Sequence, residues 1–185
     1  MPILQDLAQE TGETTHLSIL VRAELHPLAF AYAPTHVTKV TMEDTEILPF
    51  HATSSGLAVL AFQPEAFRDA VLSAPLTKLT AATETDVSVL RQRLGKIAAC
   101  GLAESAGGYE PEVASMAVPL FDALGRCSGA LSVAALASRM TPDQRSLIRG
   151  AILRAGAKIT QSWGGTLPPA IAALWRGNAQ GKATP

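Results

Sequence analysis

The chain has 185 residues, of which 48% are hydrophobic, and its formal net charge at pH 7 is −1. This length suits a single domain with a buried core, and the hydrophobic content excludes a disordered chain. The near-neutral charge gives no support for a nucleic-acid-binding surface, because such domains are usually basic. The two cysteines, Cys100 and Cys127, are too few for a disulfide framework and are expected to be reduced.

The N-terminal part of the chain is predicted to form a short helix and then a β-hairpin. Apolar residues recur at helical spacing in 3–9, and segments 15–21 and 28–32 have the pattern of strands joined by residues 24–27. Residues 36–48 lack such a pattern and are predicted to form a loop. The chain starts with no signal-peptide pattern and contains no membrane-spanning run, so we expect a cytoplasmic protein that does not contact membranes.

Three helices are predicted in the middle of the chain. Residues 56–62 are almost wholly apolar, which indicates a short buried helix capped by Thr53, Ser54 or Ser55. A second helix spans 64–72, and a third spans 83–99, starting at Thr83. Residues 102–106 are predicted to form a short strand.

Residues 112–135 are predicted to form an antiparallel hairpin around a turn at 122–125. One face carries small residues, which indicates either a ligand cavity or the close approach of a helix. The other face carries Met116, Val118, Leu120, Leu131 and Val133 and needs cover from helices. The expected register pairs Ser115 with Ser132, Ala117 with Ala130, and Val113 with Ala134.

A long helix is predicted from the Thr141-Pro142 start to about Trp163, followed by a C-terminal tail at 166–185. The order of elements indicates an α+β fold, with both hairpins in one antiparallel sheet and the helices gathered on one side.

Four ordered segments, 7–20, 48–61, 79–105 and 109–135, resemble the C-terminal effector-binding domain of IclR-type bacterial transcription regulators. The family's Ala-x-Pro-x-x-Asp-x-x-Gly core is matched by Ala117, Pro119, Asp122 and Gly125. The resemblance implies a GAF-like domain over residues 1–165 that binds a small organic-acid or aromatic effector and forms a homodimer or homotetramer. The family's N-terminal DNA-binding winged helix-turn-helix has no counterpart in the sequence, so operator binding is not expected of this chain alone.

Three positions depart from the family pattern. Leu57 replaces a usual lysine, Gly108 stands near a usual glutamate, and Glu112 stands near a usual glycine. The effector's identity therefore cannot be transferred from the family.

The candidate effector-binding residues combine a physical argument with the resemblance. The free N–H groups at the start of a buried helix attract anions, and the family places sheet residues on the same pocket. Thr53 or Ser54 could instead serve only as a helix cap, and His51 is either a ligand contact or a buried histidine bonded to the backbone. The predicted binding residues are Thr53, Ser54, Ser55, Gly56, Ser105, Ser115, Ala117, Ser132 and Ala134.

Three hypotheses for function follow: a metabolite-sensing regulatory domain, a small hydrolase or isomerase using the same cavity, and a dimerisation module with a filled interior. No catalytic residue, metal or cofactor is predicted. The sequence has no Gly-x-Ser-x-Gly motif, and its four histidines lack the spacing of metal ligands.

Overall fold

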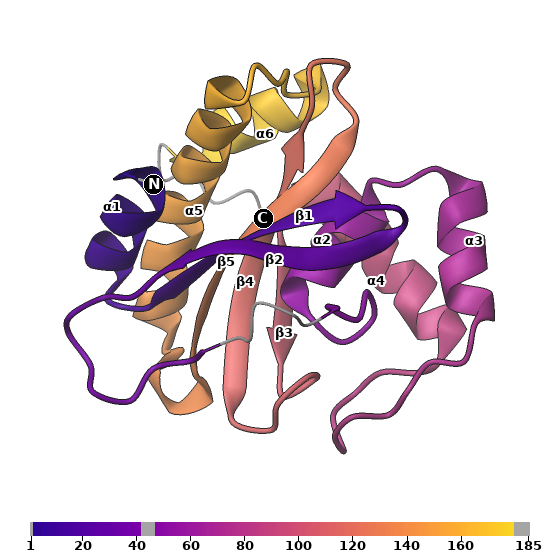
Figure 1. Cartoon of the computed structure of the whole chain (residues 1–185), viewed down its shortest axis with the longest axis horizontal. Coiled ribbons are helices and arrows are strands. Elements are labelled where there is room, and N and C mark those ends of the chain that lie inside the picture. Colours follow the sequence, from indigo (N-terminus) through magenta and orange to yellow (C-terminus); the bar gives the residue numbers. More distant parts are fainter. Residues whose placement is uncertain (1, 42–46, 180–185) are drawn as a thin grey trace.

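The chain folds into a five-stranded antiparallel sheet with helices on both faces (Figure 1). The computed structural model describes residues 2–41 and 47–179. The strand order is β2-β1-β5-β4-β3, which confirms the predicted α+β class and the single sheet. The elements are α1 (Pro2–Thr11), β1 (Thr14–Val21), β2 (Glu24–Ala31), α2 (Ser54–Ala61), α3 (Glu65–Ser73), α4 (Val87–Cys100), β3 (Ala103–Ala106), β4 (Val113–Phe121), β5 (Cys127–Leu136), the 3₁₀ turn η1 (Ala137–Arg139), α5 (Pro142–Ser162) and α6 (Pro169–Ala179).

Two groups of helices cover opposite faces of the sheet. Helix α5 packs on β4 and β5 over the face of large apolar side chains, where a Cβ atom on Gly156 would lie 2.7 Å from Val118. Helix α2 packs on the same two strands from the other side, over the face of small residues, with α4 behind it (Figure 1). The prediction that the helices gather on one side is therefore wrong, because both faces of this sheet are apolar enough to need cover.

The β4–β5 hairpin has a register two residues away from the expected one. Ser115 lies opposite Ala134, and Ser132 lies opposite Ala117. Each serine therefore faces an alanine across the pair, and the two serines are diagonal neighbours on one face of the sheet. The expected pairs Ser115–Ser132, Ala117–Ala130 and Val113–Ala134 are wrong.

Two irregularities explain this shift. Gly125 adopts a left-handed conformation with φ 70° in the turn, and the chain leaves the turn with Phe121 opposite Cys127. The next pair is Leu120 with Gly129, so a bulge leaves Ser128 out of the pairing. The turn shifts the register by one residue and the bulge shifts it by one more, and a total shift of two returns every side chain to its predicted face.

The first hairpin turns earlier than predicted. Arg22 and Ala23 both have positive φ, at 49° and 67°, as in the two-residue turns that suit a twisted hairpin. Strand β2 therefore begins at Glu24, and the prediction that residues 24–27 connect the strands is wrong. Pro27 is tolerated inside β2 because this strand lies at the edge of the sheet.

Helix α4 begins at Val87 rather than at Thr83. The carboxylate of Asp86 caps it by accepting hydrogen bonds from the N–H groups of Ser88 and Val89 at 2.7 and 3.1 Å. Thr83 has another role, since its hydroxyl donates to the Gly108 carbonyl at 2.7 Å. This bond holds the segment between β3 and β4 against the turn that precedes α4.

The C-terminal segment is more ordered than a tail. Residues 169–179 form α6, which packs on α5 and buries Ile171 and Trp175. The prediction that residues 166–185 form only a tail is therefore wrong for this helix. The predicted loop at 36–48 has no helix or strand at 36–41 and 47–48, and its remaining residues, 42–46, lie outside the described ranges.

Candidate functional site

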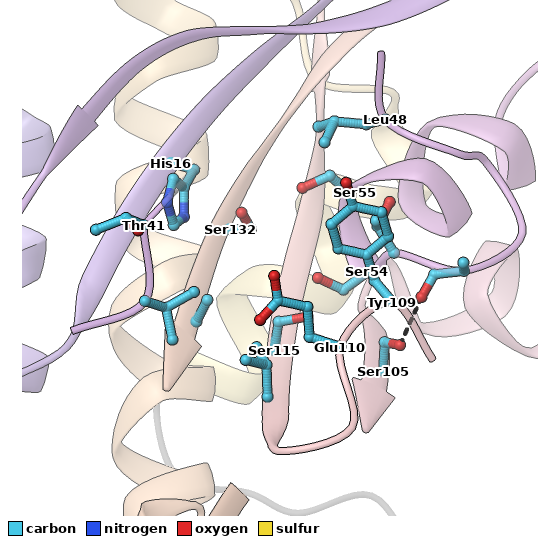
Figure 2. Close-up of a pocket in the computed structure, with 15 residues that line it drawn as sticks. His16, Thr41, Leu48, Ser54, Ser55, Ser105, Tyr109, Glu110, Ser115 and Ser132 are labelled. Carbon is cyan, nitrogen blue, oxygen red and sulfur yellow. Dashed lines mark hydrogen bonds between the residues drawn. The ribbon is translucent and has the colours of Figure 1, made fainter. Parts of the chain in front are cut away.

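A cavity lies between the small-residue face of the sheet, the start of α2 and two loops (Figure 2). The space it encloses, counted together with the open solvent at its mouth, is about 540 Å³. The sequence offered two explanations for the small residues on this face, a ligand cavity or the close approach of a helix. The structure shows both, since α2 packs on this face and the cavity lies beside it. The cavity counts against the hypothesis of a filled interior, because Ser115 and Ser132 line it.

The start of α2 forms one wall of the cavity. The Thr53 hydroxyl accepts a hydrogen bond from the Gly56 N–H at 2.9 Å and donates to the Pro49 carbonyl at 3.1 Å. Thr53 is therefore the helix cap. The next two N–H groups, on Ser54 and Ser55, have no carbonyl one turn earlier in the helix to bond. Both serine side chains line the cavity, so this wall presents backbone N–H groups and hydroxyls together.

Serines of β3, β4 and β5 line the cavity from the sheet. Ser105 is paired with Ser115 across β3 and β4, and its hydroxyl donates to the Ala52 carbonyl at 2.9 Å (dashed in Figure 2). Ser132 is paired with Ala117 on one side and His16 on the other. Within the part of the chain that the structure describes, the hydroxyls of Ser115 and Ser132 bond to no other residue and remain available.

The structure brings most of the predicted binding residues together. Gly56 and Ala117 do not line the cavity. The N–H of Gly56 is occupied by the Thr53 cap, and Ala117 is fully buried within the sheet. The predicted residues that do line it are Thr53, Ser54, Ser55, Ser105, Ser115, Ser132 and Ala134.

Sequence reasoning missed the residues that reach the cavity from elsewhere in the chain. Two segments without regular structure contribute Val40, Thr41, Leu48, Tyr109 and Glu110, and no periodic pattern marks such positions. Ala52 and Val113 complete the wall at the edges of α2 and β4.

His16 is the most informative of the missed residues. Its side chain lines the cavity from β1 and is only 2% exposed. Burial lowers the pKa of His16 to about 4, so the imidazole is neutral at pH 7. Its Nε2 atom has no hydrogen-bond partner among the described residues. The available sequence signal was a histidine inside the predicted strand at 15–21.

His51 is a structural residue. Its Nε2 donates to the Thr77 carbonyl at 2.9 Å, and the side chain does not line the cavity. The predicted alternative of a buried histidine bonded to the backbone is therefore confirmed. Among residues 2–41 and 47–179, no group of three or more His, Cys, Asp or Glu side chains is placed to hold a metal ion. In the same ranges, no helix is long and apolar enough to cross a membrane.

Replacing Thr53 by alanine is expected to remove the cap of α2. We expect Thr53→Ala to lower the unfolding free energy by about 1 kcal/mol, which corresponds to a fall in Tm of roughly 2–4 °C. Thr53→Ser keeps the hydroxyl and should retain most of the stability. Urea unfolding of both variants measures the difference. An equal loss in the two would show that the threonine methyl group, rather than the cap, stabilises this turn.

Comparison with known proteins agrees with the fold. The family described as "Bacterial transcriptional regulator IclR C-terminal" matches residues 1–161, so the chain belongs to this family. It is similar to the HTH-type transcriptional regulator XynR of Escherichia coli K12, with 28% identity over 87% of this chain and 64% of XynR. Its fold matches an IclR transcriptional regulator from Silicibacter sp. TM1040 at a TM-score of 0.90, with 49% identity over 91% of this chain and 66% of that one.

A third match carries a ligand. It is an IclR homolog from Microbacterium hydrocarbonoxydans complexed with 4-hydroxybenzoate, with a TM-score of 0.74 and 27% identity over 87% of this chain and 66% of that one. The chain spans less than two thirds of the length of XynR. The comparisons thus show that this chain is a domain of the kind found at the C-terminus of IclR transcriptional regulators.

Proposed function

We propose that this domain senses a small organic acid and binds its carboxylate at the start of α2. The observation that carries the proposal is the convergence on one cavity of the α2 start with the hydroxyls of Ser115 and Ser132. Helix N-termini stabilise anions because their N–H groups lack partners and carry the positive end of the helix dipole. The described lining contains no Lys or Arg, so these dipoles would supply the stabilisation.

The lining favours an acid with an apolar body. Leu48, Val113 and Ala134 provide apolar wall, and the polar side chains of the lining can fix the orientation of the ligand. The 4-hydroxybenzoate complex of the Microbacterium protein supports an acid of this size in a domain of this fold.

Ligand binding would regulate DNA recognition by a helix-turn-helix domain, the kind of domain for which the relatives are named. The regulator would be a homodimer or a homotetramer. Regulators that read two half-sites are commonly symmetric, which supports this assembly. The enzymatic alternative gains no specific support. His16 is too weak a base when its pKa is about 4, and the matched relatives are named as regulators.

Filling the cavity tests the proposed function. Ser132→Leu places a larger side chain in the space the ligand needs, and we expect affinity for a bound acid to fall at least about 100-fold because a clash replaces a contact. A thermal-shift screen of small organic and aromatic acids, 4-hydroxybenzoate included, identifies the acid, and titration calorimetry measures the loss.

The matched control is Ser146→Leu, which adds the same side chain at an exposed position on α5, away from the cavity. Its affinity should equal that of the unmodified chain. Undiminished binding by Ser132→Leu would refute the assignment of the cavity, and turnover of the bound acid would favour the enzyme.

A further inference from the structure

The β1 wall of the cavity carries a buried polar atom that nothing in the described chain satisfies. His16 is paired directly with Ser132 across β1 and β5, so the two side chains project side by side from the same face of the sheet. Both line the cavity, and Figure 2 shows them as neighbours. His16 Nε2 is without a partner, as is the hydroxyl of the buried Ser18, two residues further along β1.

Such an atom calls for an explanation, because buried polar side chains nearly always have a partner. His16 is neutral, and a neutral imidazole offers one N–H donor and one acceptor nitrogen. Ser132 adds a hydroxyl that can donate or accept. A group that both donates and accepts can satisfy this pair whichever ring nitrogen carries the proton, and a hydroxyl is the smallest such group.

The polar groups of the cavity therefore form two separate sites. Figure 2 shows Ser54 and Ser55 on the side of the cavity opposite His16, with Ser132 between them. The first site suits an anion, whereas the second has no cationic side chain in the described lining. Glu110 is exposed and also lines the cavity, and its negative charge disfavours a second anionic group on the ligand.

We propose that His16, with Ser132, is the specificity-determining residue of this cavity and binds a hydroxyl group at the end of the ligand opposite its carboxylate. This inference rests on the proposed function, because it presumes that the carboxylate lies at the start of α2. It assigns the effector to the class of hydroxy monocarboxylic acids and excludes dicarboxylic acids of the same length.

Matched series of acids test this assignment. The aromatic series is 4-hydroxybenzoate, benzoate and benzene-1,4-dicarboxylate, and the aliphatic series is 4-hydroxybutanoate, butanoate and succinate. Titration calorimetry gives Kd for each acid with the unmodified chain and with His16→Leu and His16→Asn. The ratio of Kd values within a series is the readout, because a purely structural effect of the substitution would change all members equally.

In at least one series we expect the hydroxy acid to bind about tenfold more tightly than the unsubstituted acid, the value of one hydrogen bond to an otherwise unpaired buried group. This ratio should fall to about one in His16→Leu and recover in part in His16→Asn, which keeps a polar group. The dicarboxylate should bind more weakly than either.

The outcomes separate the inference from the proposed function. Equal affinities for the hydroxylated and unsubstituted acids, or tighter binding of the dicarboxylate, overturn the role of His16 while the sensor function stands. Failure of every acid in both series and in the thermal-shift screen overturns both.

Nitrogen-15 NMR of the unmodified chain provides a second measurement, which does not depend on whether the His16→Leu variant folds. The ring resonances of His16 should shift with the hydroxy acid and much less with the unsubstituted one. Identical shifts from the two acids would overturn the assignment.

Discussion

Lowering the pH from 6.5 to 4 is expected to destabilise the folded domain by about 3 kcal/mol through His16 alone. The pKa of this histidine falls from 6.5 to about 4 on folding because burial disfavours the charged ring. A tenfold difference in proton affinity between the folded and unfolded states is worth about 1.4 kcal/mol of stability. The described structure offers the protonated ring no carboxylate partner.

The sign follows from which state binds the proton. Between pH 6.5 and 4 the unfolded chain takes up a proton that the folded chain does not, so the unfolding free energy falls as the pH falls. The contribution of His16 is complete above pH 6.5 and is lost once the pH reaches about 4.

Urea unfolding at several pH values between these limits measures the effect, with His16→Leu as the control. Carboxylates and the other histidines titrate in both proteins, so the difference between the two stability curves isolates His16. This difference should change by about 3 kcal/mol across the range. Parallel curves would mean that His16 gains a partner on protonation or is more exposed than the structure shows.

The fold could be predicted because local signals and the buried faces agree. The Thr141-Pro142 start, the wholly apolar segment at 56–62 and the alternation along 112–135 each specify one element. The register of β4–β5 could not be predicted in the same way. It depends on the turn at Gly125 and on a bulge at Ser128, and the residue types at 122–129 reveal neither.

The candidate site was predictable only on the elements with a pattern. Ser54 and Ser55 follow the helix-start signal, and Ser115 and Ser132 follow the strand alternation. Leu48 and Glu110 reach the cavity from segments without periodicity, and His16 depends on the pairing of β1 with β5, two strands more than a hundred positions apart in the sequence. Such pairings are set by the tertiary structure.

Helix α6 was missed for a different reason. Ile171 and Trp175 are four residues apart and both buried, which is a helical pattern. The prolines and glycines around them favoured a tail, although Pro169 stands at the first position of the helix, where proline is well tolerated.

Gly56→Ala is expected to destabilise the domain by about 3 kcal/mol, the upper part of the range for overpacking a rigid site. An added Cβ atom would lie 2.5 Å from the Pro49 carbonyl oxygen and 2.5 Å from the Phe50 Cα. Both are backbone atoms, and α2 is buried along its whole length, so neither side can move without disturbing the core. Relief of the clash must displace either α2 or the segment before it.

The same displacement should impair ligand binding, because the two parts in contact at Gly56 also form the cavity. Segment 48–52 provides Leu48 and Ala52, and α2 provides Ser54 and Ser55. We therefore expect Gly56→Ala to bind acids more weakly even under conditions where it remains folded, although Gly56 itself does not line the cavity. Calorimetric titration and thermal unfolding of the same variant measure the two effects.

Gly95→Ala is the matched control. Gly95 is exposed on α4, and an added Cβ atom would meet nothing within 4 Å. Because alanine favours a helix interior over glycine, this variant should gain about 0.5–1 kcal/mol and bind acids as the unmodified chain does. If Gly56→Ala lowers the unfolding free energy and Gly95→Ala raises it, the loss at position 56 results from the close approach of α2 and segment 49–50. A Gly56→Ala variant as stable as the unmodified chain would show that this approach is looser than 2.5 Å and that the α2 start is free to shift.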